Sequence, residues 1–244
     1  MSKEQIRQYS VATIFGLVLF ILLSGYLFLR RGYFDLYIIN KVSAGASLII
    51  LAVVILIGPL SRLYDRFDSW IIYRKELGIV AFLLALAHGV ISFFFLSDRF
   101  SITYFMNHLV TFILGFTSVF VLGYLFILSF ERIINFLDRK KWWLVQSWGV
   151  RIAGILAFLH VFLLKYPGWL KWYTQGGAPE LARPYLPSAS IIAFAFAFFV
   201  VLVRLAEFFG KKVGRIMVFL LFILLIFFLI GSFLWGSFYP NLFK

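Results

Sequence analysis

Long apolar runs alternate with short charged segments along the whole chain, and this pattern predicts membrane-spanning helices. Runs of about 20 apolar residues recur, the length that an α-helix needs to cross a hydrocarbon core about 30 Å thick. Such runs are found at residues 10–30, 43–60, 77–97, 107–130, 146–165, 188–209 and 214–238. The sequence therefore predicts an all-α, polytopic membrane helix bundle with seven spans.

The composition excludes a soluble fold. Of the 244 residues, 63% are hydrophobic and 14% are charged, which is far more apolar than a soluble domain of this length. The segments between the runs are too short for a Rossmann-type nucleotide domain, so we expect any dehydrogenase partner to be another polypeptide. The first run lacks the small-residue site at which a signal peptide is cleaved, so it is interpreted as an uncleaved span.

The net charge of +13 would suggest a nucleic-acid partner for a soluble protein. Here the expected partner is the lipid bilayer, and no nucleic acid is expected. Lys and Arg gather in alternate loops, 14 in one set and 8 in the other, with Arg151 inside a span. Because cytoplasmic loops carry the excess of Lys and Arg, the N-terminus is predicted to be cytoplasmic and the C-terminus outside.

Two histidines share one flanking pattern in separate spans. His88 follows Ala81 and Ala85, and His160 follows Ala153 and Ala157, each time at a spacing of seven and three residues. At 100° per residue these alanines fall on the face of their histidine, which leaves a slot for a flat, bulky group. An ionisable side chain inside a membrane marks a functional site by default.

Both histidines are predicted to lie at similar depth, in the outer half of the bundle. His88 is about 20 Å from Arg74, and His160 about 25 Å from Trp143, both counted from the cytoplasmic face. Opposed imidazoles at one depth suit the axial ligands of a haem iron. The chain has no cysteine, which excludes disulfides, thiolate ligation and iron–sulfur clusters.

Other interpretations of the histidine pair stay open. A zinc or copper site would need a third ligand, and a proton relay would need a carboxylate, but no Cys, Asp or Glu lies at that depth. The remaining alternative is a pair of buried histidines that are merely hydrogen-bonded to the backbone. His108, at the outer start of the fourth span, is interpreted as an interfacial histidine or as part of an outer quinone or substrate pocket.

Arg74 and Gln146 each precede one of the paired histidines by 14 residues, which places them within about 40° of the same helix face. Arg74 is either a positive-inside residue or, facing the cavity, a ligand for a flavin phosphate or a quinone headgroup. The connection 166–187 is expected to be the longest outer loop. It is either a partner surface or lid, or a segment lying passively on the headgroups.

Several segments resemble the ferric-reductase-like transmembrane domain family over roughly residues 45–165. They read GPLSRL at 58–63, RKELGIVAF at 74–82, ALAH at 85–88, WLVQSW at 143–148 and LH at 159–160. The likeness is closest to the stand-alone bacterial branch, the haem-binding membrane subunit of the periplasmic methionine sulfoxide reductase system. It implies a bacterial inner membrane protein with b-type haem on His88 and His160 and electrons passing outward.

The resemblance also sets expectations about cofactor number and domains. The wider family has a second, inner haem, whose ligands would fall near Arg74 and near Gln146 or Ser147, where this chain has no histidine. One haem is therefore expected, with FMN or a quinone as a substitute relay. The expected domains are a six-helix haem-binding core at 1–209 and an additional helix at 210–244.

The leading functional hypothesis is a membrane b-type cytochrome subunit. It would carry electrons from a cytoplasmic flavin reductase or quinol to an outer-face redox partner or small acceptor. A second hypothesis is a single-haem oxidoreductase that reduces ferric chelates or oxygen directly. A third is a non-redox transporter or scaffold, which predicts no visible haem spectrum.

Overall fold

The computed structural model describes residues 2–130, 133, 138–177 and 180–242 of the chain. Within these residues the regular structure is entirely helical. The longer helices are α1 (Lys3–Arg31), α2 (Leu36–Leu63), α3 (Arg74–Val90), α5 (Leu109–Ile127), α7 (Arg139–Gln175), α8 (Ala189–Ala206) and α9 (Gly210–Leu242). Shorter elements are η1 (Asp65–Tyr73), the π-helical turn η2 (Ile91–Phe95), α4 (Ile102–Asn107) and η3 (Glu207–Phe209).

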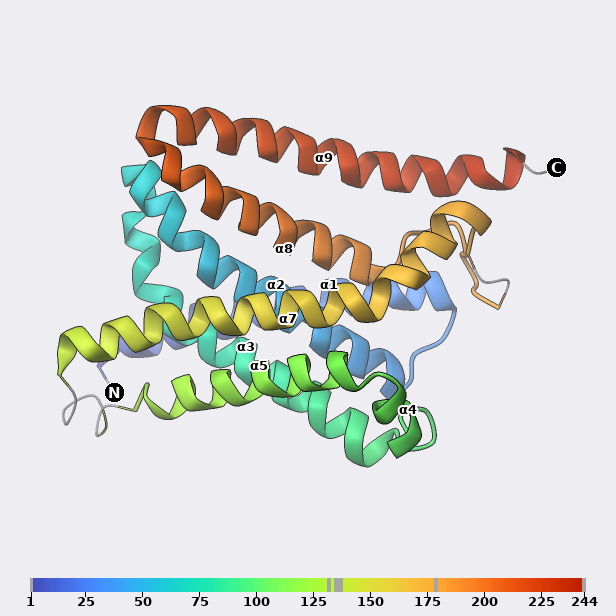
Figure 1. Cartoon of the computed structure of the whole chain (residues 1–244), viewed down its shortest axis with the longest axis horizontal. Helices are drawn as coiled ribbons and strands as arrows, with labels where there is room; N and C mark the ends of the chain where they lie inside the picture. Colours follow the sequence, from blue (N-terminus) through green and yellow to red (C-terminus); the bar gives the residue numbers. More distant parts are fainter. Residues whose placement is uncertain (1, 131–132, 134–137, 178–179, 243–244) are drawn as a thin grey trace.

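The long helices lie side by side and alternate in direction, so that the two termini emerge at opposite ends of the bundle (Figure 1). Six described stretches are long and apolar enough to cross a membrane, and the last of them, Ala189–Phe238, contains both α8 and α9. The chain reverses between these two helices at Gly210, whose φ of 78° suits a residue without a side chain. The structure is thus the polytopic helical bundle that the sequence predicts.

We call the end of the bundle that holds the N-terminus the inner end, because the sequence predicts it to be cytoplasmic. The inner end also holds η1 and η3, and the outer end holds α4 and the connection before α8 (Figure 1). Which end faces the cytoplasm stays a prediction from loop charge.

Helix α2 is at the centre of the bundle. It packs along α1, α3 and α8 and also contacts α7 and α9. One core cluster joins α2 and α3 to α5 and α7, with Ile50, Val54, Leu122 and Val150 among its buried residues. A second cluster joins α2 to α8 and α9. Helix α9 is outermost, and it contacts chiefly α8.

Helices α1, α2, α7 and α9 are longer than their predicted spans, whereas α3, α5 and α8 are shorter. The largest difference is in α7. The sequence suggested a loop from 166, but α7 continues through Pro167 to Gln175. The continuation is stabilised by burial, because Trp169 and Trp172 are only 9% and 5% exposed. The described part of the outer loop therefore starts at Gly176, and the preceding residues belong to the helix.

Candidate functional site

The paired histidines lie on two antiparallel helix pairs, α2 with α3 and α5 with α7. Each pair packs closely along its length, whereas α3 and α7, which carry the histidines, make few contacts with each other. His88 lies three residues before the π-helical turn η2, a departure from α-helical geometry that is frequent at functional sites. Both imidazoles are half-buried and lie in the outer half of their helices.

Asn40 of α2 holds the His88 imidazole. The Nδ1 of His88 is 2.7 Å from the Asn40 side-chain oxygen and 3.2 Å from the Asn40 backbone oxygen. The Asn40 amide nitrogen donates to the Ser92 hydroxyl at 2.9 Å, which fixes the orientation of the amide and leaves its oxygen toward His88. Asn40 itself is only 1% exposed, so this arrangement is enclosed.

His160 is held by the backbone of α5. Its Nδ1 donates to the Thr111 carbonyl oxygen at 2.6 Å. The ring lies against Gly115, because a Cβ placed on that glycine would be 2.7 Å from the His160 Nδ1. A second glycine, Gly149 of α7, lies equally close to Leu125 of α5. The glycines let the two helices approach until the imidazole reaches a main-chain carbonyl.

These contacts fix one tautomer for both histidines. A carbonyl oxygen only accepts hydrogen bonds, so the Nδ1 of His88 and of His160 must each carry the proton. The Nε2 of each ring then has a free lone pair, and among the described residues neither Nε2 has a hydrogen-bond partner. A neutral imidazole whose Nδ1–H bonds to a carbonyl is the usual state of a metal-ligating histidine.

A second hydrogen bond connects the two helices of each pair, seven residues closer to the inner end than the histidine contact. The Ser47 hydroxyl of α2 donates to the Ala81 carbonyl at 2.8 Å. The Ser118 hydroxyl of α5 donates to the Ala153 carbonyl at 2.9 Å. Ser47 comes seven positions after Asn40, and Ser118 comes seven positions after Thr111. In the facing helices, Ala81 and Ala153 each come seven positions before their histidine. The two helix pairs therefore repeat one register, and this register sets the histidines at matching positions.

The alanine stripe predicted to form a slot contributes to helix packing. Ala81 and Ala153 are fully buried, and Ala85 is 9% exposed, all within the core cluster that joins the two pairs. Ala157 is partly buried and packs against the same cluster. Small side chains here allow the serine–carbonyl contacts between helices. Accommodation of a flat cofactor by this stripe stays a prediction.

The structure does not bring Arg74 and Gln146 together. Arg74 Nε donates to the Val54 carbonyl at 3.2 Å and lines a cavity with Ser147 of α7. The Gln146 amide instead donates to the Leu125 carbonyl of α5 at 3.1 Å. Of the two residues proposed to hold a flavin or quinone, only Arg74 lines this cavity, because Gln146 points toward α5.

The third histidine stands apart from the pair. His108 is exposed, between α4 and α5, with its ring centroid 4.7 Å from that of Tyr104. Burial raises the pKa of the Tyr104 hydroxyl, and repulsion from an ionised Tyr37 raises it further. The described residues contain no group of three or more His, Cys, Asp or Glu side chains that could hold a metal ion. A metal at the paired histidines would therefore have to bring its other ligands, as the iron of a haem does.

Sequence reasoning did not identify the residues that hold the imidazoles. Asn40, Ser47, Thr111 and Ser118 were missed, although their spacing carries a signal. Two polar residues lie seven positions apart in one helix, and an alanine and a histidine lie seven positions apart in its partner helix. This combination of spacings occurs twice along the chain. Gly115 carries no comparable sequence signal, because its contact depends on the neighbouring helix.

The fold and these contacts define the class as a multi-pass helical membrane protein with two imidazoles held through Nδ1. Residues 43–153 match the family model described as "Ferric reductase like transmembrane component". The matched region runs from α2 into α7, includes His88, and ends seven residues before His160. It is similar to the membrane part of ferric-reductase-like proteins, which supports a membrane redox subunit. A search of curated proteins found no match.

Proposed function

We propose that this protein is a membrane b-type cytochrome subunit that carries electrons across a bacterial inner membrane through a single bis-histidine haem. The donor would be a cytoplasmic flavin reductase or quinol, and the acceptor a redox partner or small molecule at the outer face. The observation that carries the proposal is the pair of Nδ1-protonated imidazoles, each with a free Nε2, on two helix pairs of equal register.

His88 and His160 would hold the iron through Nε2. Bound in this way, haem b supplies a reversible one-electron carrier. Asn40 and the Thr111 carbonyl keep the Nδ1 protons in place, which orients the rings and increases the basicity of Nε2. Histidines that are only hydrogen-bonded within the protein would explain the Nδ1 contacts equally well, since neither Nε2 is an enclosed atom without a partner. The haem proposal adds a role for both Nε2 atoms.

One haem is proposed because the chain has no histidine at the positions where the family resemblance implies an inner pair of haem ligands. These positions hold Arg74 in one helix and Gln146 and Ser147 in the other. FMN or a quinone at the inner end, beside Arg74, would then accept electrons from the cytoplasmic donor. An assignment to the methionine sulfoxide reductase system requires its outer partner and is the narrower form of this proposal.

A second candidate is direct reduction of ferric chelates at the outer end. Three basic side chains surround the ring of Tyr37 there: Lys41 at 4.3 Å, Arg99 at 4.4 Å and Arg31 at 5.2 Å from its centroid. The positive charge of the two arginines attracts anionic chelates. It favours this candidate over a purely protein acceptor, and the same cations could pair with haem propionates.

The test is the visible spectrum of the purified full-length chain, oxidised and dithionite-reduced, for wild type, His88→Ala and His160→Ala. We expect a low-spin b-type Soret and α-band with one haem per chain in wild type, and loss of both bands in either variant. His108→Ala is the matched control, because it removes an exposed histidine outside the pair and should leave the spectrum unchanged. If the wild-type protein stays colourless after haem supplementation, the cytochrome proposal is wrong, and the transporter or scaffold hypothesis is the one that remains.

A further inference from the structure

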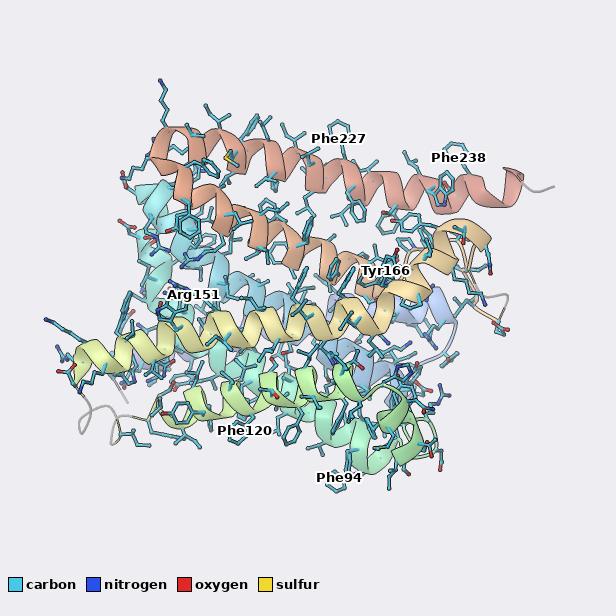
Figure 2. The ribbon with its side chains drawn as sticks, viewed as in Figure 1. Phe94, Phe120, Arg151, Tyr166, Phe227 and Phe238 are labelled. Atoms are coloured by element: carbon cyan, nitrogen blue, oxygen red, sulfur yellow. The ribbon has the colours of Figure 1, made fainter. Side chains whose placement is uncertain are left out.

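A cavity at the inner end of the bundle is lined by four arginines from four different helices. They are Arg62 of α2, Arg74 of α3, Arg151 of α7 and Arg204 of α8. The enclosed part of the cavity is about 20 Å³, room for about one water-sized group, and the cavity opens toward the surface. Figure 2 labels Arg151 about a third of the way along α7, on the side of the helix that α2 occupies in this view.

Negative charge at this cavity is scarce. Glu207 of η3 forms ion pairs with Arg62 and with Arg204, the latter at 2.7 Å. Arg74 and Arg151 have no carboxylate partner in the part of the chain that the structure describes. One carboxylate against four guanidiniums leaves an excess of three positive charges at the cavity.

Two of the guanidiniums keep most of their donors free for a ligand. Arg74 uses Nε on the Val54 carbonyl, and Arg151 lies with its guanidinium 5.0 Å from the centroid of the Trp148 ring. Each guanidinium has five N–H groups arranged as a planar fork. The Ser147 hydroxyl lines the same cavity and adds a neutral donor.

We propose that this cavity is a binding site for a phosphate group. A phosphate group presents several oxygens with one or two negative charges, and it matches convergent guanidinium forks better than a single carboxylate does. The site lies between helices toward the inner end of the bundle, since Arg62 is in the last turn of α2 and Arg74 begins α3, while Arg151 reaches it from inside a predicted span. Basic pockets between helices at this level bind phosphate headgroups of anionic lipids. The phosphate can belong to such a lipid or to a soluble phosphate ester.

The probes are inorganic phosphate and a short-chain phosphatidylglycerol, with short-chain phosphatidylcholine and chloride as controls at constant ionic strength. The readout is the thermal unfolding temperature of the full chain in a neutral detergent, which needs no haem and no redox activity. We expect a saturable rise for wild type. A rise with both probes supports the site, a rise with phosphatidylglycerol alone assigns it to a lipid, and a rise with phosphate alone assigns it to a soluble ester.

Three variants locate the effect. Arg151→Gln and Arg74→Gln should each weaken the apparent affinity about tenfold, the loss expected for one charge-assisted contact. Lys212→Gln is the matched control, because it removes an exposed cation at the same end of the bundle. No saturable rise in wild type, or the same affinity loss in Lys212→Gln as in Arg151→Gln, would overturn the proposal. If Arg74→Gln fails to fold because Val54 loses its partner, Arg151→Gln and the wild-type titration still decide it.

Discussion

The two histidine-bearing helix pairs share one register but hold their imidazoles by different means. In the α2–α3 pair, the Asn40 side-chain oxygen makes the closer contact with His88 at 2.7 Å, and the Asn40 backbone oxygen lies further away at 3.2 Å. In the α5–α7 pair, the main chain of Thr111 contacts His160 at 2.6 Å. The residue four positions after each contact differs accordingly, since it is Ala44 in one pair and Gly115 in the other. A methyl group is tolerated where a side chain spans the gap, and none is tolerated where the ring contacts the backbone.

This difference predicts where each pair is vulnerable. A side-chain acceptor can be removed by substitution, but a main-chain carbonyl cannot. The α2–α3 pair should therefore depend on Asn40, and the α5–α7 pair should depend on the glycines that allow its helices to approach.

The largest effect is expected for Gly115→Ala. The added Cβ would lie 2.7 Å from the His160 Nδ1 and 2.9 Å from its Cε1, so the ring must leave the Thr111 carbonyl. We expect a loss of about 1–3 kcal/mol in unfolding free energy, together with loss of the haem spectrum. Gly89→Ala is the control, since it adjoins His88 with nothing within 4 Å of the new Cβ. An unchanged spectrum in Gly115→Ala would contradict this account of His160.

Ala81→Leu and Ala153→Leu should have similar effects in the two pairs. Both alanines are fully buried against the neighbouring helix, and a larger side chain costs about 1–3 kcal/mol by overpacking. Unfolding by denaturant measures this loss. If the variants instead keep wild-type stability and lose only haem, the stripe serves as a cofactor slot and its packing role is minor.

Asn40→Leu and Thr111→Val compare the two ways of holding an imidazole. Asn40→Leu removes the side-chain oxygen that accepts from His88, and loss of such a partner typically weakens metal binding by about 10–100-fold. Thr111→Val keeps the carbonyl that accepts from His160, and only the hydroxyl contact with the His108 carbonyl is lost. Titration of apoprotein with haem should therefore show a large change for the first variant and almost none for the second. Equal changes in haem affinity for the two variants would mean that a side-chain acceptor and a main-chain acceptor do not differ in their effect on haem binding.

The smallest effects are expected for Ser47→Ala and Ser118→Ala. Each removes one buried hydrogen bond to an alanine carbonyl, and such interhelical bonds average about 0.6 kcal/mol in membrane proteins. The two losses should be equal if the register is a true repeat. A large loss in one pair alone, measured by unfolding in mixed detergent micelles, would show that the pairs are fastened differently.

Much of the fold could be predicted from the sequence, because span length and helical periodicity are local properties. The positions of His88 and His160 in their helices followed from the same periodicity. Periodicity defines the face of a helix but not the helix that it meets. The contacts with Asn40 and Thr111, and the separation of Arg74 from Gln146, required the tertiary structure.

The extent of α7 was not predictable for a different reason. Pro167 is a strong signal for a helix end, since it lacks the N–H that an interior helical residue donates. Burial of Trp169 and Trp172 outweighs that loss. The arginine cavity was likewise hidden, because its residues are spread from position 62 to position 204. The sequence places Arg151 inside a span and makes Arg74 a candidate ligand, but it does not show that these two meet Arg62 and Arg204.

The repeated register fastens each histidine-bearing helix to its neighbour at two levels, seven residues or about 10 Å apart. Two fastening points prevent both rotation and sliding of one helix on the other, which a single hydrogen bond cannot do. The imidazoles are thereby kept in place whatever charge a group between them carries. If haem binds between them as proposed, the site would have a small reorganisation energy, because its ligands would move little when an electron arrives or leaves.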